Sequence, residues 1–141
     1  MPQIYLDAVR EEHQTVNRLF RLLGARLVNA GDGMAEVAAP VRGDFSQGGG
    51  MVAGGILAAL ADEAMAHAVL SALPQGKACV TAEMNVRCLR GLAPDAGGDI
   101  RAEASLVKRG SALFVAESRV YDGRNRLLAT AGATFYITGA G

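Results

Sequence analysis

The chain has 141 residues, a length that suits one domain built around one core. Half of the residues are hydrophobic and 20% are charged, which excludes a disordered chain. The 14 basic and 14 acidic side chains cancel and no basic tract is present, so we expect no nucleic-acid partner.

The two cysteines and the N-terminus indicate the compartment. Cys79 and Cys88 have a spacing that fits neither a disulfide framework nor a zinc site. We therefore expect small buried cysteine side chains, no metal site and a reducing environment. The first residues, MPQIYLDAVREEH, mix acids and bases and lack an apolar signal core. These features predict a cytoplasmic protein.

The chain begins with a predicted N-terminal helical segment, 1–23. From Asp7 to Leu23 apolar residues recur at helical spacing with charged residues between them, and Gly24 is a suitable stop. Two short strands are then predicted at Arg26–Ala30 and Met34–Ala38, because a turn-rich stretch, NAGDG, joins two apolar runs.

A central helix is predicted at 52–73, inside the stretch GGGMVAGGILAALADEAMAHAVL. This helix is long enough to span a membrane. However, Asp62, Glu63 and His67 would lie in mid-bilayer, where a central Asp alone costs roughly 2.5–3.5 kcal/mol. An all-round apolar helix that is not in lipid must be wrapped by protein. We therefore expect a buried core helix and no membrane partner.

The residues after Gly76 alternate between apolar and polar types, as they do in strands with one buried face. Four long antiparallel strands are predicted, at Ala78–Leu89, Asp99–Lys108, Ala112–Asp122 and Arg126–Thr138. The face of the first strand that is predicted to be buried carries Val80, Ala82, Met84, Val86 and Cys88, and the opposite face carries Thr81, Glu83, Asn85 and Arg87. The simplest packing is an α+β domain, 1–141, in which an antiparallel sheet curls around the central helix.

This arrangement resembles the hotdog fold, an antiparallel sheet wrapped around a long central helix. From about Phe20 to Ile137 it is similar to the phenylacetate-degradation-type (PaaI-like) acyl-CoA thioesterases. In that family the helix opening usually reads Asn or Gln, then His-Gly-Gly six positions on, then an acid nine positions beyond the His. Here these positions hold Gln47, Ala53-Gly54-Gly55 and Asp62. Three later segments, TAEMNVRCLR, VKRGS and LLATAGATFYI, resemble the family's strand and turn segments.

The resemblance implies roles for four residues of a catalytic site. Asp62 would be the general base that activates water, or the nucleophile. Gly54 would donate its backbone N–H to the thioester oxygen, and Gln47 would orient the water or the carbonyl. Thr81, coming from the second subunit of a dimer, would bind the attacking water.

The resemblance also implies how the substrate is held. Gly55 would allow close approach to the thioester, and Arg90 and Arg109 would hold the phosphates of coenzyme A. Leu57 and Met65 would line the acyl pocket. The expected partner is an acyl-CoA, with coenzyme A present only as part of the substrate and no separate cofactor. The expected assembly is a homodimer with sites at its interface, forming a dimer of dimers.

Other functions and roles stay open at this point. Ala53 replaces the family's His, so a non-catalytic acyl-CoA-binding module is the alternative. A hydroxyacyl-thioester dehydratase ranks third, because neither His13 nor His67 is suitably placed to pair with Asp62. Glu63 is predicted mainly to pair with His67 on an exposed or interface surface, with a role as the working acid as the lesser option.

In each case a structural role competes with the catalytic one. Asp62 could be a cap or an interface ion pair, and Gln47 a solvated loop amide. Thr81 could be an ordinary strand residue, and the arginines solvated surface charges.

Overall fold

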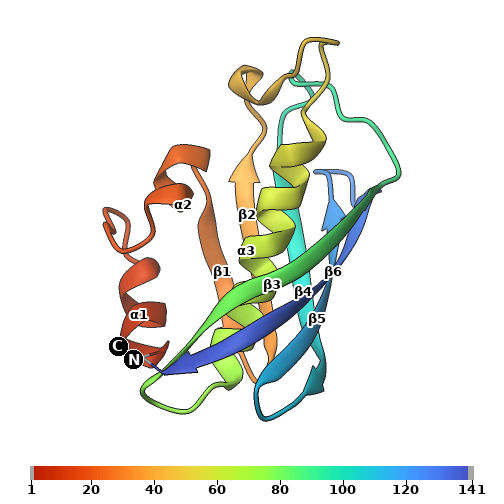
Figure 1. Cartoon of the computed structure of the whole chain (residues 1–141). Helices are drawn as coiled ribbons and strands as arrows, with labels where there is room; N and C mark the ends of the chain where they lie inside the picture. The colour runs from red at the N-terminus through yellow and green to blue at the C-terminus, as the bar shows by residue number, and fades with distance from the viewer. Residues whose placement is uncertain (1, 140–141) are drawn as a thin grey trace.

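The computed structural model of the protein describes residues 2–139, so Met1, Ala140 and Gly141 of the predicted domain lie outside the described residues. Six strands form one antiparallel sheet, ordered β1-β2-β4-β5-β6-β3, which curls around one long helix (Figure 1). This confirms the predicted hotdog fold. The elements are α1 Pro2–Val9, α2 Arg18–Leu23, β1 Arg26–Gly31, β2 Met34–Pro40, a 3-10 turn Gly43–Phe45, α3 Gly54–Ala72, β3 Lys77–Cys88, β4 Asp99–Arg109, β5 Leu113–Tyr121 and β6 Leu127–Gly139.

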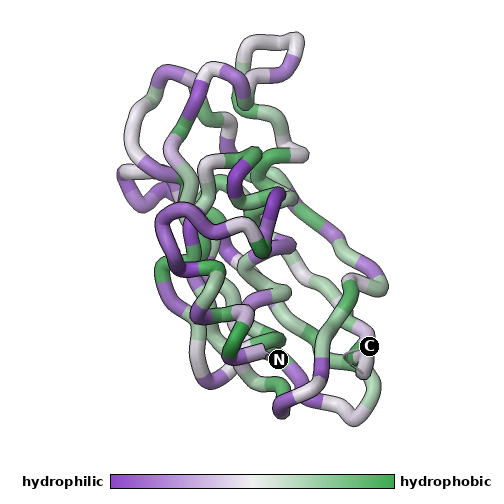
Figure 2. Tube along the Cα trace, turned by 90° about the vertical axis from the view of Figure 1, so that its left-hand side faces the viewer, coloured by the Kyte–Doolittle hydropathy of each residue, from purple (hydrophilic) through white to green (hydrophobic). Residues whose placement is uncertain are grey.

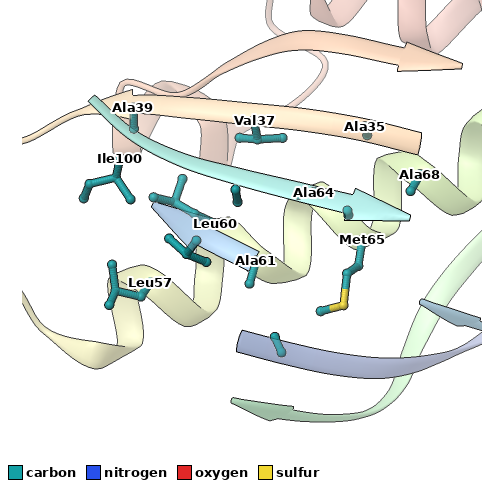
Figure 3. Close-up of a cluster of buried hydrophobic side chains, with 14 of the residues drawn as sticks. Ala35, Val37, Ala39, Leu57, Leu60, Ala61, Ala64, Met65, Ala68 and Ile100 are labelled. Atoms are coloured by element: carbon teal, nitrogen blue, oxygen red, sulfur yellow. The ribbon is translucent and has the colours of Figure 1, made fainter. Parts of the chain in front are cut away.

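Helix α3 forms the centre of the hydrophobic core and contacts all six strands. Leu60, Ala61 and Met65 are completely enclosed between the helix and the sheet (Figure 3). The helix is long and apolar enough to cross a membrane by length and composition alone. Here the strands cover its apolar faces, which confirms the prediction of a helix wrapped by protein.

The single N-terminal helix predicted over Asp7–Leu23 is wrong. The structure has two short helices, α1 and α2, separated by irregular chain. Asn17 starts α2 as its N-cap, because its side chain accepts the Phe20 N–H at 3.0 Å. Gln14 hydrogen-bonds to both the N–H and the carbonyl of Asn17 at 2.8 and 2.9 Å. These side-chain bonds compete with continuous helix and break the periodic segment in two.

The N-terminal segment lies along the side of α3 that the sheet leaves open (Figure 1). Helix α1 contacts α3 and β1. Seen from that side, the segment mixes hydrophilic and hydrophobic residues (Figure 2). Only part of its apolar surface is buried: Phe20 is 1% exposed, whereas Val16 is 50% exposed. The segment therefore covers α3 with a few residues rather than with one continuous helical face.

Strand β3 lies at an edge of the sheet and contains a β-bulge at Ala82. Thr81 pairs with Phe135, whereas Glu83 pairs with Thr134, so Ala82 is the extra residue. Phe135 is buried, so the Thr81 side chain shares the face that looks toward α3. A bulge reverses the face of every residue on one side of it.

The bulge makes half of the predicted β3 face assignment wrong. Val80, predicted to be buried, points outward and is 55% exposed, and Thr81, predicted to point outward, faces the helix. Beyond the bulge the predicted alternation holds, with Met84 and Val86 paired to Ala133 and Ala131 on the helix side. The remaining strands and α3 lie within about two residues of their predicted bounds.

Candidate active site

Asp62 and Thr81 meet beside the exposed flank of α3. The Thr81 hydroxyl Oγ1 donates a hydrogen bond to Oδ1 of Asp62 at 2.9 Å. Both residues belong to the same chain, so the expectation that Thr81 reaches Asp62 from a second subunit is wrong. The reason is the bulge at Ala82, which turns Thr81 toward the helix. Within residues 2–139 no other side chain hydrogen-bonds to this carboxylate, so Oδ2 is free to face a water molecule.

The start of α3 offers unpaired backbone donors. Ala53 is the N-cap and makes no side-chain capping bond, while its own N–H donates to the Phe45 carbonyl at 2.8 Å. The N–H groups of Gly54 and Gly55 have no hydrogen-bond partner within residues 2–139. The first turn of a helix also carries partial positive charge. This end of α3 can therefore hold an oxygen that becomes negative during a reaction.

The two halves of this site are far apart within one chain. Gly54 and Asp62 lie on the same helix, separated by about 12 Å of rise at 1.5 Å per residue. One carbonyl group cannot touch both.

Cys88 lies against the start of α3, and Cys79 lies beside Asp62. A Cβ atom added to Gly54 would lie 3.2 Å from the Cys88 Sγ, a tight contact that the thiol could relieve only by moving a few tenths of an ångström. Cys88 is exposed at the end of the edge strand, so its prediction as a buried side chain is wrong. Cys79 is half-buried, and burial followed by the charges of Asp62 and Glu63 raises its pKa to about 12. Cys79 therefore stays a neutral thiol and is a poor nucleophile.

The Gln47 side chain bonds to its own loop. Its Oε1 accepts the N–H of Gly49, and its backbone N–H donates to the Met51 carbonyl at 2.8 Å. The side chain is exposed. The structure thus places Gln47 in the loop that leads into α3 without bringing its side chain into contact with Asp62.

The four remaining predicted residues are not gathered in one place within the chain. Arg90 donates its N–H to Leu128 at the start of β6, whereas Arg109 pairs with Phe114 near the other end of the sheet. Leu57 and Met65 are 3% and 0% exposed. Both side chains are enclosed within the single chain, between α3 and the sheet. That they line an acyl pocket between two chains stays a prediction.

Glu63 and His67 differ from their prediction, because the two side chains do not bond to each other. Asn17 Nδ2 donates to Oε1 of Glu63 at 3.0 Å and to the Tyr5 hydroxyl at 2.9 Å. The Tyr5 hydroxyl lies 2.9 Å from Nε2 of His67, and Nδ1 of His67 lies 2.6 Å from the Glu63 carbonyl oxygen. We call these four residues the Glu63 ring. Sequence reasoning missed Tyr5 and Asn17, although Asn17 three residues before Phe20 was an available N-cap signal.

Burial shifts the titration of the Glu63 ring. It raises the pKa of Glu63, opposed by the Asn17 hydrogen bond, and the neighbouring Asp62 raises it further. It lowers the pKa of His67, opposed by the Glu63 carbonyl, and raises that of Tyr5 to about 12. His67 and Tyr5 are therefore both predominantly uncharged near neutral pH. Oε1 of Glu63 accepts a hydrogen bond from Asn17, so this carboxylate is directed toward the N-terminal segment rather than toward Thr81.

No group of three or more His, Cys, Asp or Glu side chains within residues 2–139 is arranged to hold a metal ion. The chemistry on offer is a carboxylate oriented by a hydroxyl, together with free N–H groups at a helix start. This combination suits hydrolysis of an acyl compound through a developing oxyanion.

Comparisons with known proteins identify the family of the chain. The sequence model of the thioesterase superfamily matches residues 49–129, which contain Gly54, Asp62 and Thr81. The chain belongs to the thioesterase superfamily. A curated relative from Halobacterium salinarum is 39% identical over 72% of this chain and 68% of its own length. That relative is named as an esterase on a provisional basis.

Two solved structures are similar over most of this thioesterase. The conserved protein PA5202 of Pseudomonas aeruginosa is 30% identical, with a TM-score of 0.81 over 90% of this chain and 98% of its own. The PaaI protein of the E. coli phenylacetic acid degradation operon is 25% identical, with a TM-score of 0.80 over 88% of this chain and 86% of its own. The PaaI-type resemblance is thereby confirmed, and the protein is a thioester hydrolase.

Replacing Thr81 with valine should lower the turnover number while leaving the fold intact. Valine has nearly the shape of threonine but lacks the hydroxyl that holds Asp62. Loss of a hydrogen bond to a charged group is worth about 1.5–3 kcal/mol, or roughly 10–100-fold in rate. Thr81→Ser keeps the hydroxyl and should retain most activity. Steady-state thioester hydrolysis by the three proteins checks this, and equal turnover of Thr81→Val and wild type would contradict it.

His67 should make the protein less stable as the pH falls below the ordinary histidine pKa of 6.5. In that range the unfolded chain binds a proton at His67, whereas the folded chain, with a lowered pKa, does not. Stability is therefore lost on acidification, by at most about 1.4 kcal/mol per pH unit. Urea unfolding between pH 7 and 5 should show a steeper loss for wild type than for His67→Gln. The opposite contribution of Glu63 is common to both proteins, so parallel curves would contradict the prediction.

Proposed function

We propose that the protein hydrolyses acyl-CoA thioesters at a site shared between two copies of the chain. Asp62 and Thr81 of one protomer act together with the start of α3 of the other. The observation that carries this proposal is the hydrogen bond from Thr81 to Asp62. It places an oriented carboxylate on the open flank of a helix that is otherwise almost wholly apolar.

The separation of Gly54 and Asp62 along α3 supports a shared site. A thioester whose carbonyl oxygen lies at one helix start is about 12 Å of helix rise away from Asp62 of the same chain. A second chain can bring its own Asp62 to that carbonyl. The donors at the helix start and the carboxylate would then come from different protomers.

The proposed reaction uses both halves of this site. A water molecule held by Oδ2 of Asp62 attacks the carbonyl carbon as Asp62 takes a proton, and the backbone N–H groups of Gly54 and Gly55 of the partner subunit bind the oxyanion. Collapse breaks the carbon–sulfur bond, and the proton on Asp62 passes to the coenzyme A thiolate. The alternative is direct attack by Asp62, which gives an anhydride that water then opens. In both routes Thr81 orients the carboxylate.

Because residue 53 is alanine, only backbone N–H groups are available to bind the oxyanion at the start of α3. The Ala53 methyl group cannot donate a hydrogen bond to the carbonyl, and no side chain caps the start of α3. A binding module without turnover was the alternative that this replacement suggested. Membership of the thioesterase superfamily and the paired Asp62 and Thr81 favour hydrolysis.

The proposed substrate is an acyl-CoA with a small acyl group, which can be aromatic. Ala58 and Ala59 are half-buried on the first turns of α3, and their small side chains would leave room for an acyl group. The similar PaaI protein comes from a phenylacetic acid degradation operon, which adds support for aromatic acyl groups. Arg90 is the better placed of the two candidate arginines for the coenzyme A phosphates, because it follows the end of β3 near Gly54. We propose no further cofactor and a cytoplasmic location.

Replacing Asp62 with asparagine should reduce hydrolysis by at least about a hundredfold, because the amide can neither take a proton nor attack the carbonyl. The measurement is thiol release from a panel of aliphatic and aromatic acyl-CoAs, with Glu63→Gln as the neighbouring control. Hydrolysis that survives in Asp62→Asn would remove Asp62 from the mechanism. A wild type that binds acyl-CoA without turning it over would instead favour the binding module.

One turnover in H₂¹⁸O, with enzyme in excess over substrate, separates the two routes open to Asp62. A general base places ¹⁸O in the released acid during the first turnover. A nucleophile whose anhydride is opened by water at the aspartyl carbonyl carbon places it first in the Asp62 carboxylate, where mass spectrometry of the peptide detects it. Label in Asp62 therefore identifies the nucleophilic route.

The exposed edge of β3 supports a homodimer. Within residues 2–139 this strand pairs only with β6, so the backbone groups along its other side are free. Val80, Met84 and Leu89 are 55%, 37% and 54% exposed. A long free edge with apolar side chains is favourable for pairing with a second strand. We propose that two copies pair along β3, and that such dimers pair again as a dimer of dimers.

Replacing Met84 with aspartate should weaken the dimer, because a charge would be buried at the joined edges. Ile4→Asp is the matched control, since Ile4 is also apolar and 67% exposed but lies on α1. Sedimentation velocity over a range of concentrations should show Met84→Asp shifting to monomer and losing activity with it. A monomeric wild type that hydrolyses thioesters would overturn the shared site.

A further inference from the structure

The Glu63 ring has one consistent set of donors and acceptors. A carbonyl oxygen can only accept, so Nδ1 of His67 donates to the Glu63 carbonyl and Nε2 accepts from the Tyr5 hydroxyl. The Tyr5 oxygen accepts one N–H of Asn17, and Oε1 of Glu63 accepts the other. The chain of hydrogen bonds thus starts at the backbone of Glu63 and closes at its side chain.

The ring joins three separate segments and is partly shielded from water. Tyr5 lies on α1, Asn17 caps α2, and Glu63 and His67 lie on α3. His67 is 1% exposed and stacks on Phe20 with ring centroids 5.1 Å apart. Hydrogen bonds in such surroundings are strong and costly to break, because a broken one leaves a buried polar group unpaired. The ring therefore holds this turn of α3 against the N-terminal helices.

The ring adjoins both partners of the Asp62–Thr81 hydrogen bond. Glu63 directly follows Asp62 on the helix. Cys79 precedes Thr81 by two positions on the same face of β3, and its Sγ lies 3.9 Å from the Ala66 carbonyl of α3. The charges of Asp62 and Glu63 both act on this thiol. Cys79 therefore lies where the ring and the catalytic pair meet.

We propose that the Glu63 ring is a positioning device for catalysis: by fixing α3 against α1 and α2, it holds the Asp62 carboxylate in reach of Thr81. Tyr5, Asn17 and Glu63 are positioning residues under this proposal, and none of them touches the thioester. The inference rests on the proposed role of Asp62. It assigns the N-terminal segment, which precedes the part of the chain that the superfamily model matches, a role in catalysis.

Two substitutions break the ring with little other change. Asn17→Ser keeps an oxygen that can cap α2, since serine caps helices about as well as asparagine, but it removes the two amide donors. Tyr5→Phe removes only the hydroxyl. Glu63→Gln keeps an acceptor for Asn17 and serves as the conservative variant, with Glu63→Ala as its disruptive counterpart. Leu6→Ala is the control, because Leu6 lies on α1 and is buried at 3% outside the ring.

The first readout is the division of the kinetic effect between kcat and KM. A misplaced catalytic group lowers kcat, so Asn17→Ser, Tyr5→Phe and Glu63→Ala should each lose about tenfold or more in kcat with KM changed by less than about twofold. Glu63→Gln should stay within about threefold of wild type. Leu6→Ala, compared at the same interval below its Tm, should keep its kcat.

The second readout does not depend on thioester hydrolysis. Iodoacetamide labelling of Cys79 reports how closely α3 packs on β3, and exposed Cys88 serves as the internal reference. Trypsin cleaves after Lys77, Arg87 and Arg90, so the two cysteines fall in different peptides for mass spectrometry. The ring-breaking variants should label Cys79 at least about threefold faster, whereas Leu6→Ala and Glu63→Gln should not.

The outcomes separate the failure of this inference from the failure of the proposed function. Loss of kcat together with faster Cys79 labelling, in the ring-breaking variants alone, supports the positioning role. Equal losses in Leu6→Ala and the ring-breaking variants overturn it, because the ring would then contribute only stability. If wild type hydrolyses no thioester, the proposed function fails. Unchanged Cys79 labelling would then still overturn the claim that the ring holds α3 in place.

Discussion

The architecture depends on one requirement: helix α3 must be covered on nearly every side, yet it carries two adjacent carboxylates. Consecutive residues point about 100° apart around a helix. Asp62 and Glu63 therefore need polar partners in two different directions, and the apolar centre of the sheet provides none. Thr81 of the edge strand meets Asp62, and Asn17 of the N-terminal segment meets Glu63. The partners come from the two places where the central strands stop covering the helix.

Each of these contacts requires a local departure from regular structure. The extra residue Ala82 in β3 turns Thr81 inward, and the break before Asn17 lets its side chain cap α2 and reach Glu63 at once. Edge strands and irregular segments tolerate such departures, because no neighbour on the far side must follow them. The polar chemistry is therefore located at the margins of the core, on the edge strand and on the irregular N-terminal segment.

The start of α3 presents backbone N–H donors, whereas the middle of α3 carries the Asp62 carboxylate. Gly54 and Gly55 present free N–H groups, and the Cys88 side chain packs against Gly54. Asp62 lies too far along the same helix to act with these donors on one carbonyl. The proposed pairing of two chains along β3 would resolve this separation and would also cover the exposed apolar side chains of that strand. The same pairing would make stability and activity depend on one interface.

The sequence by itself determined the order and bounds of the long elements, the wrapped central helix and the nine-residue interval from Ala53 to Asp62. These are local properties, because the period of the apolar residues reports helix or strand directly. Only the tertiary structure decided which way Thr81 points, that Cys88 is exposed, and that Tyr5 and Asn17 meet Glu63 and His67. A single bulge reverses a strand face without changing the composition of the strand. The Tyr5–His67 contact joins residues 62 positions apart. No local pattern specifies such a contact, since it exists only after the sheet has brought α1 onto the open flank of α3.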